Sequence, residues 1–117
     1  MNTNEKWKKI NGYKNYEVSS KGNIRNIHTK KYKAVRKTKT GYLITDLKEN
    51  GTKQTKYIHR LVAEAFVANL NNYPCVNHKD ENKDNNCVEN LEWCTVAYNN
   101  NYGKNHTAKG FKWEVVD

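Results

Sequence analysis

The stretch VNHKDENKDNN, residues 76–86, has an unusual composition for a chain whose formal net charge is +9. It contains three acidic residues, four asparagines, two lysines and one histidine. Because Asn and Asp side chains hydrogen-bond to nearby backbone groups, such a run forms an irregular but rigid loop without a large core. We expect this loop to begin at His78, and the stretch raises the question of what a histidine does there.

The segments around the loop predict a compact unit of two short strands and a helix. Residues 75–77 are expected to form the first strand, and NLEWCT, residues 90–95, the second, because its large apolar residues alternate. Thr95 is a suitable N-cap for a helix over residues 96–102, which Gly103 would end. Regular structure would therefore anchor the loop at both ends.

The first half of the chain is predicted to consist mainly of short strands separated by turns. Turn residues occur at 20–22, where Gly22 is suited to a positive φ, and at 49–52. The segments expected to form strands are residues 16–19, 23–27, 33–37, 41–47 and 53–58. A helix of about two turns is expected over residues 59–67, with its apolar side chains on one face. Apolar residues also alternate over 111–115, which would add an edge strand, and the whole pattern indicates an α+β fold.

Charge is distributed unevenly along the chain. Residues 1–60 contain 16 Lys and Arg against 4 Asp and Glu, whereas residues 61–117 contain 5 against 8. A basic half of this kind predicts a polyanionic partner, with phosphate backbones ahead of membrane surfaces. No apolar run approaches the roughly 18 residues of a membrane span, and the N-terminus lacks the apolar core of a secretory signal. We therefore expect a cytoplasmic protein that binds nucleic acid and no membrane.

Two familiar metal sites do not fit the loop. Asp80, Asn82 and Asp84 are spaced like the oxygen ligands of an EF-hand, but the required glycine is replaced by Asn85 and the required glutamate by Leu91. Four dispersed histidines and three cysteines without a C-x-x-C pair do not indicate a zinc site either.

A hydrolytic site is the interpretation that remains. An imidazole titrates near neutrality and accepts a proton from water, provided that another group orients it. Asn77, directly before His78, and Asn99, on the following helix, each bring an oxygen suited to a hard cation such as Mg²⁺. A phosphodiester substrate would supply the remaining charge and ligands.

Four blocks of the sequence, taken in order, carry a family resemblance. HRLVAEAF, VNHKDENKDNN and ENLEWCTVAYNN resemble the HNH homing endonuclease family, in the branch common in bacteriophages. WKKINGYKNYEVSSKGNIRNI resembles the nuclease-associated modular motif that often precedes the HNH unit and aids DNA binding. The resemblance implies an α+β chain with a basic β-rich DNA-binding motif over residues 1–52, a ββα-metal (His-Me finger) nuclease unit over 53–104 and a tail over 105–117.

The resemblance also implies roles by position. His78 would be the general base, and Asn90 the middle asparagine of the motif, which ties the loop and orients the histidine. Asn77 and Asn99 would bind a divalent cation, Mg²⁺ or Mn²⁺ and not zinc, and no small-molecule cofactor is implied. By the same resemblance, His59 and Arg60 match a recurrent His-Arg pair that either faces the phosphates or supports the site. The side chains expected at the DNA are this pair and the basic residues Lys33, Arg36, Lys37, Lys39, Lys79 and Lys83.

The implied function is hydrolysis of double-stranded DNA by a nicking endonuclease of phage or mobile-element type, acting as a monomer in the cytoplasm of a bacterial host. Many relatives have aspartate where this chain has Asn77, and a neutral amide is a weaker ligand for Mg²⁺ than a carboxylate. The alternative is therefore an HNH-fold DNA-binding protein with weakened catalysis. A protein-binding module that uses the acidic half against a basic partner is a further alternative.

Overall fold

The computed structural model of the protein describes residues 5–109, which form a mixed α+β structure of three small antiparallel sheets and two α-helices. The elements in chain order are β1 (Trp7–Ile10), β2 (Tyr13–Ser19), β3 (Ile24–Asn26), β4 (Arg36–Lys37), β5 (Leu43–Glu49), β6 (Thr52–Tyr57), α1 (Ile58–Phe66), β7 (Cys75–His78), a 3₁₀ turn (Val88–Asn90), β8 (Leu91–Cys94) and α2 (Val96–Lys109). The α+β class expected from the sequence is confirmed. Within residues 5–109 no helix is both long and apolar enough to cross a membrane.

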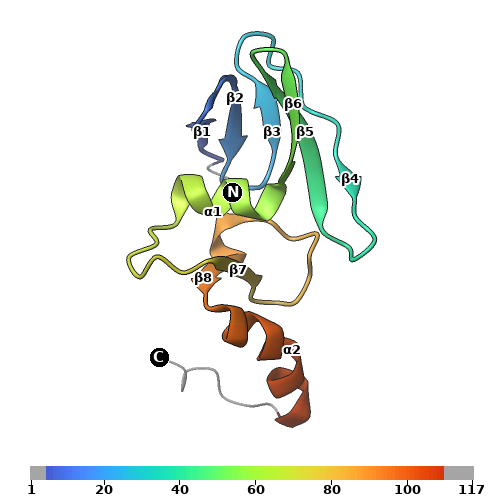
Figure 1. Cartoon of the computed structure of the whole chain (residues 1–117), viewed down its shortest axis with the longest axis vertical. Coiled ribbons are helices and arrows are strands. Elements are labelled where there is room, and N and C mark those ends of the chain that lie inside the picture. Colours follow the sequence, from blue (N-terminus) through green and yellow to red (C-terminus); the bar gives the residue numbers. More distant parts are fainter. Residues whose placement is uncertain (1–4, 110–117) are drawn as a thin grey trace.

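The elements are arranged around α1 (Figure 1). The sheets β1–β2–β3 and β4–β5–β6 lie on one side of α1, and the β7–β8 hairpin and α2 lie on the other. β7 pairs with β8 from Cys75 opposite Cys94 to His78 opposite Leu91. The polar loop therefore connects the two strands of one hairpin, and α2 follows that hairpin directly.

One hydrophobic core connects the sheets, α1 and the β7–β8 hairpin. Its buried members among the described residues are Ile10, Val18, Ile24, Leu47, Ile58, Leu61, Val62, Ala63, Val76 and Leu91. Val18, Leu47 and Val62 come from β2, β5 and α1, and each is completely buried. Because burying such a side chain contributes roughly 1.5–3 kcal/mol, the β-rich first half and the unit formed by α1 and the β7–β8 hairpin stabilise each other. The boundary expected after residue 52 falls at the first residue of β6, and it remains a prediction.

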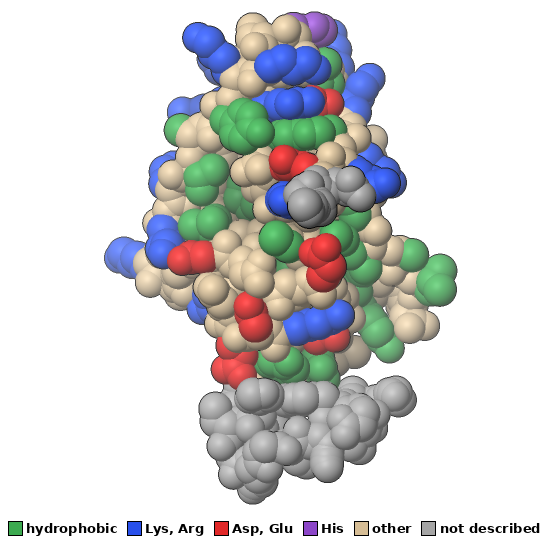
Figure 2. All heavy atoms as spheres, turned by 180° about the vertical axis from the view of Figure 1, so that it is seen from behind, with side chains coloured by type: hydrophobic (Ala, Val, Ile, Leu, Met, Phe, Trp, Pro, Cys, Tyr) green, Lys and Arg blue, Asp and Glu red, His purple; other side chains and the backbone are tan. Residues whose placement is uncertain are grey.

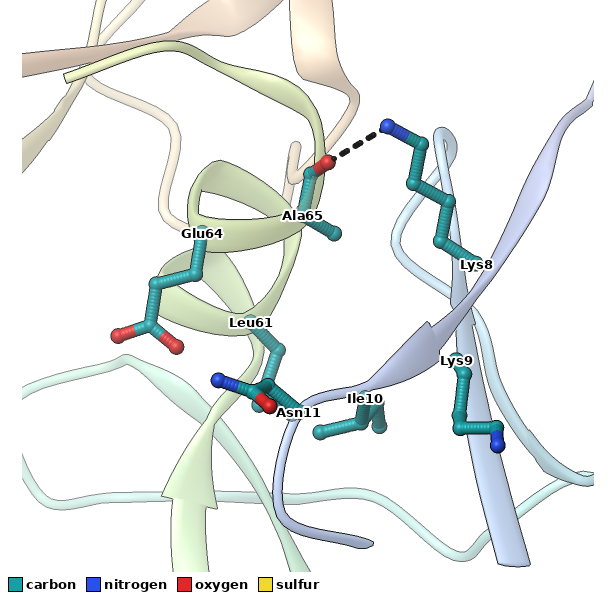
Figure 3. A pocket seen from close by; sticks show the side chains of 7 residues that line it. All are labelled: Lys8, Lys9, Ile10, Asn11, Leu61, Glu64 and Ala65. Carbon is teal, nitrogen blue, oxygen red and sulfur yellow. Dashed lines mark hydrogen bonds between the residues drawn. The ribbon is translucent and has the colours of Figure 1, made fainter. Parts of the chain in front are cut away.

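β1 provides a second link to α1 (Figure 3). The Lys8 ammonium donates a hydrogen bond of 3.0 Å to the Ala65 carbonyl at the C-terminal end of α1, where a cation is favoured by the helix dipole. Ile10 and Leu61 line the same pocket, whose volume is about 170 Å³. β1 has no strand signal in the sequence, because its two adjacent lysines hide the alternation that pairing with β2 imposes.

Two expectations about element limits differ from the structure. The expectation that Gly103 would end the second helix is wrong, since α2 runs to Lys109 and enters the segment expected as the tail. Glycine inside a helix costs about 1 kcal/mol relative to alanine, which weakens a helix without ending it. β4 contains two residues instead of the five expected over 33–37. The edge strand expected over 111–115 lies outside the described residues.

Candidate active site

The side chain of Asn90 closes the polar loop between β7 and β8. Its amide nitrogen donates to Asp80 Oδ1 and to the Asn85 carbonyl, each at 2.9 Å, and its Oδ1 accepts from the Asp80 backbone N–H at 3.0 Å. Its carbonyl also accepts from the Lys79 N–H at 2.8 Å. Asn90 therefore joins the beginning of the loop to its end, which is the tying role that the family resemblance implies for this position.

His78 is the last residue of β7, and only 5% of its surface is exposed. Its Nε2 lies 2.7 Å from Asn86 Oδ1, while the Asn86 amide nitrogen faces the Lys83 carbonyl at 3.4 Å. An amide oxygen only accepts hydrogen bonds, so Nε2 carries the hydrogen and Nδ1 keeps its lone pair when the ring is neutral. The side chain that orients His78 is thus Asn86, whereas Asn90 acts on the loop.

Asn77 is buried beside a carboxylate of the opposite strand. It is paired in register with Glu92, and its Nδ2 donates to Glu92 Oε2 at 2.8 Å. The Tyr98 hydroxyl from α2 donates to the same oxygen at 3.2 Å. Because the oxygen and nitrogen of an amide diverge from one carbon, the Asn77 carbonyl oxygen faces away from Glu92.

Asn77, His78 and Asn99 line one hollow, so the structure brings together the three residues expected to bind metal and activate water. The hollow has a volume of about 480 Å³. The residues around it are Tyr42, Val76, Asn77, His78, Glu81, Lys83, Asn99, Asn100 and Tyr102. Thr95 Oγ1 accepts from the Tyr98 N–H at 3.1 Å, which confirms the expected N-cap of the helix that carries Asn99.

A second histidine lies directly behind His78. The ring centroids of His59 and His78 are 4.9 Å apart, and Tyr42 stacks on His59 with centroids 5.1 Å apart. Burial lowers the pKa of His59 to about 3, and the neighbouring His78 and Arg60 add to this shift. Burial also lowers the pKa of His78, although the hydrogen bond to Asn86 opposes the shift. Both imidazoles are therefore neutral at pH 7.

Six of the eight side chains expected at the DNA come from outside α1, and five of these form two groups that adjoin each other. Arg36, Lys37 and Lys39 lie in or beside β4, and Lys79 and Lys83 lie in the loop after β7. Lys33 lies beside β3, where its N–H donates to the Ile24 carbonyl at 2.8 Å. Lys37 forms an ion pair of 3.2 Å with Asp84, and the Lys83 ammonium donates to the Thr40 carbonyl at 2.7 Å. The β4–β5 turn therefore contacts the polar loop beside the hollow.

On the face shown in Figure 2, Lys and Arg side chains are most numerous over the N-terminal sheets, and acidic side chains are more frequent toward the β7–β8 end.

The remaining two side chains expected at the DNA, His59 and Arg60, are held by contacts within the protein. His59 is 7% exposed. Arg60 donates to the Pro74 carbonyl at 2.8 Å, and its guanidinium carbon lies 5.5 Å from the centroid of the Trp93 ring. These contacts are those of residues that support α1, and a direct contact of this pair with DNA remains a prediction.

Sequence reasoning missed three residues of the site: Asn86, Glu92 and Tyr42. No local pattern distinguishes Asn86 from the neighbouring asparagines of the loop. Glu92 could have been found from the strand register, since it lies opposite Asn77. Tyr42 belongs to the strand expected over residues 41–47, and no local signal marks it as a residue of the site.

Two family models match consecutive parts of this chain. Residues 5–54 match the NUMOD4 motif, and residues 56–101 match the HNH endonuclease. The second match contains the β7–β8 hairpin, the closed loop with its histidine, and the part of α2 that carries Asn99. The chain therefore belongs to the HNH endonuclease family and carries a NUMOD4 motif before its HNH domain.

Individual relatives support this assignment. The chain is 45% identical over 97 residues to an uncharacterised HNH endonuclease of Acanthamoeba polyphaga mimivirus, an alignment that covers 83% of this chain and 29% of the relative. It is 39% identical over 94 residues to the DNA endonuclease I-HmuI of Bacillus phage SP01, covering 80% of this chain and 54% of I-HmuI. A solved structure of the HNH homing endonuclease I-HmuI, concerned with DNA binding and cleavage, matches with a TM-score of 0.76 and 33% identity over 95% of this chain and 63% of that chain. This chain thus spans about half the length of I-HmuI in sequence and less than a third of the mimivirus protein.

The low pKa of His59 predicts a loss of stability in mild acid. The unfolded chain binds a proton at His59 near pH 6.5, whereas the folded chain does so only near pH 3, so stability is complete above pH 6.5 and falls as the pH decreases below it. Between pH 7 and pH 5 the free energy of unfolding should decrease by about 2 kcal/mol from this group. Urea titrations at several pH values measure how steeply the free energy of unfolding changes with pH. This dependence should become smaller in His59→Gln. An equal slope in that variant would assign the pH dependence to other groups.

Proposed function

We propose that this chain is a metal-dependent endonuclease that hydrolyses DNA phosphodiester bonds with His78 as the general base. The observation that carries the proposal is the position of His78, which is fixed through Nε2 at the edge of a hollow that also contains Asn77 and Asn99. The HNH match over residues 56–101 and the similarity to a phage DNA endonuclease support it.

The geometry of His78 suits proton abstraction from water. Nε2 donates to Asn86, so Nδ1 is the atom that accepts the proton as the water attacks phosphorus. The lowered pKa of His78 keeps the ring unprotonated at pH 7 and therefore ready to act as a base. Once the ring is protonated, Asn86 Oδ1 and the carboxylates of Asp80 and Asp84 stabilise the imidazolium. General base catalysis of this kind contributes roughly 10²- to 10⁴-fold to the rate.

The donor set of the hollow fits a hard divalent cation, Mg²⁺ or Mn²⁺. Asn77 and Asn99 would hold it through amide oxygens, and the Glu92 carboxylate orients Asn77 by accepting from its Nδ2. Within the described residues no cluster of three or more His, Cys, Asp or Glu side chains is placed to bind a metal. Much of the negative charge around the cation would therefore come from the substrate phosphate, as is common for Mg²⁺ sites. When bound, the cation would supply Lewis-acid stabilisation of the charge on that phosphate.

The basic side chains beside the hollow would hold the DNA backbone. Lys37, Lys39 and Lys79 are exposed, and Lys83 lines the hollow itself. Lysines at phosphates position a duplex without reading its sequence. One active site cuts one strand, so we propose a monomer that nicks double-stranded DNA in the cytoplasm of a bacterial host.

Replacing the proposed base should abolish cleavage. In an assay on supercoiled plasmid with Mg²⁺, His78→Ala should reduce the nicking rate by at least about 100-fold, because general base catalysis contributes roughly 10²- to 10⁴-fold to the rate. His28→Ala is a matched control, since His28 lies in the turn after β3, away from the hollow. A His78→Ala protein that nicks plasmid at the wild-type rate would exclude His78 as the base.

A second candidate function is DNA binding by an HNH fold with weakened catalysis. The observation that favours it is the neutral side chain at position 77, whose amide already donates to Glu92. Replacing Asn77 by aspartate alone does not test this idea cleanly. The new carboxylate would lie next to Glu92 Oε2, and two like charges at this separation repel each other.

Exchanging the two groups tests the metal role without that repulsion. In Asn77→Asp combined with Glu92→Gln, the hydrogen bond is retained with its direction reversed, and the charge moves into the hollow. The Mg²⁺ concentration that gives half-maximal nicking should decrease by about tenfold or more, because a carboxylate binds Mg²⁺ more strongly than an amide does. Glu92→Gln alone is the control. An unchanged Mg²⁺ requirement would exclude residue 77 as a ligand, and activity found only in the double variant would establish the second candidate function.

Binding to duplex DNA should depend steeply on salt. Each phosphate contact releases counterions, so the logarithm of the binding constant should fall linearly with the logarithm of the salt concentration. Lys39→Ala should reduce the slope by about 1 if Lys39 contacts a phosphate. Fluorescence anisotropy with a labelled duplex and EDTA measures the slope without cleavage. Binding that is weak and insensitive to salt would instead support a module whose partner is a protein.

A further inference from the structure

The turn between β2 and β3 belongs to the NUMOD4 motif, yet it packs against the polar loop of the HNH domain. The Val88 N–H donates to the Ser20 carbonyl at 2.8 Å, which joins the turn to the loop end beside Asn86. The turn is itself rigid, because the completely buried Ser19 accepts through Oγ from the N–H groups of Lys21 and Asn23, each at 3.1 Å. A rigid turn of one motif is therefore fixed on the site-forming loop of the other.

Gly22 makes the closest approach in this contact. Its φ is +90°, and a Cβ added to it would lie 3.0 Å from Asn86 Cβ and 3.2 Å from the Asn86 carbonyl oxygen. Both distances are tighter than nine in ten real Cβ contacts, so a side chain at position 22 would require Asn86 to shift by a few tenths of an ångström. Asn86 therefore lies so close to the turn only because residue 22 has no side chain.

Asn86 is also the residue whose oxygen holds Nε2 of His78, at 2.7 Å. Asn86 is 4% exposed and has little room to move without losing that bond. The contacts form a short series, from the backbone of Gly22 to the side chain of Asn86 and from there to the imidazole of His78.

We propose that the Ser20–Gly22 turn of the NUMOD4 motif is a positioning element of the nuclease site. The turn holds Asn86 in the position from which its Oδ1 selects the tautomer of His78. The proposal rests on the proposed role of His78 as general base. It gives the NUMOD4 motif a part in the chemical step that is separate from any affinity for DNA. It also makes Gly22 and Asn86 positioning residues, since neither would touch the reacting atoms.

The test compares two glycines that share a backbone conformation and differ in their surroundings. Gly12 has a φ of +88°, and a Cβ added there would meet nothing within 4 Å. Gly12→Ala therefore imposes the same backbone strain as Gly22→Ala without a clash. Both variants are made in the full chain, and three quantities are measured: the ¹⁵N shifts of the His78 ring in the metal-free protein, the Kd for duplex DNA in EDTA, and the nicking rate at saturating DNA.

In Gly22→Ala, the His78 ring should lose its uniform Nε2–H tautomer, and the nicking rate should fall by about 10- to 100-fold with an unchanged Kd, as when a ligand loses the group that orients it. In Gly12→Ala, the tautomer, Kd and rate should remain those of the wild type. Asn86→Ala should reproduce the effect of Gly22→Ala, and the two changes together should cost no more than either alone, because they act through the same contact.

Several results would overturn the proposal. These are a wild-type tautomer in Gly22→Ala, equal losses in both glycine variants, or losses that add when Gly22→Ala and Asn86→Ala are combined. If Gly22→Ala does not fold, Ser19→Ala loosens the same turn without adding a side chain and should change the tautomer in the same direction; an unchanged ring would contradict the proposal. If the wild type binds DNA without nicking it, the proposed function fails, and the ring shifts still decide whether the turn positions His78.

Discussion

The hydrogen bonds of the Asn90 side chain are the constraint on which the site depends. The loop between β7 and β8 is almost entirely polar, so hydrophobic packing cannot determine its shape. Asn90 instead joins Asp80 to Asn85 across the loop. Its Nδ2 donates to both residues, and its Oδ1 accepts from the Asp80 N–H. The closed loop holds Asn86 against the imidazole of His78. A buried donor or acceptor left without a partner costs about 1–3 kcal/mol, so the buried Asn90 amide favours the closed form of the loop in which its partners are present.

The site is built mainly from neutral groups. Asn77, Asn86 and Asn99 offer amides, and burial keeps both His59 and His78 uncharged at neutral pH. Two imidazoles with centroids 4.9 Å apart could not both carry a charge in such surroundings without strong repulsion. Under the proposed function, such a site would gain most of its charge from the substrate phosphate and the cation. It differs in this respect from carboxylate clusters, which attract a cation before any substrate is present.

The features that could be predicted from the sequence are those with a local signal. The alternation over residues 41–47, the Asn- and Asp-rich loop and the Thr95 N-cap all depend on neighbours a few positions away, and each appears in the structure. The family resemblance also indicated Asn77, His78 and Asn99, which the structure places around one hollow.

What could not be predicted depends on contacts between distant parts of the chain. β1 exists because β2 lies beside it, and α2 continues through Gly103 although glycine weakens a helix. Asn86 is one of four asparagines in its stretch, and its contacts with Gly22 of the distant β2–β3 turn and with the His78 ring distinguish it from the others.

The core shared by β2, β5 and α1 has a consequence for how such chains recombine. Modular motifs are often regarded as independent units that can be exchanged between nucleases. Here the sheet that precedes the HNH domain covers part of its interior and supplies the turn against its loop. A grafted HNH domain would therefore arrive with an uncovered apolar surface and an unsupported loop, unless its new neighbour offered a matching sheet. The packing by itself therefore favours keeping the two motifs together as a pair.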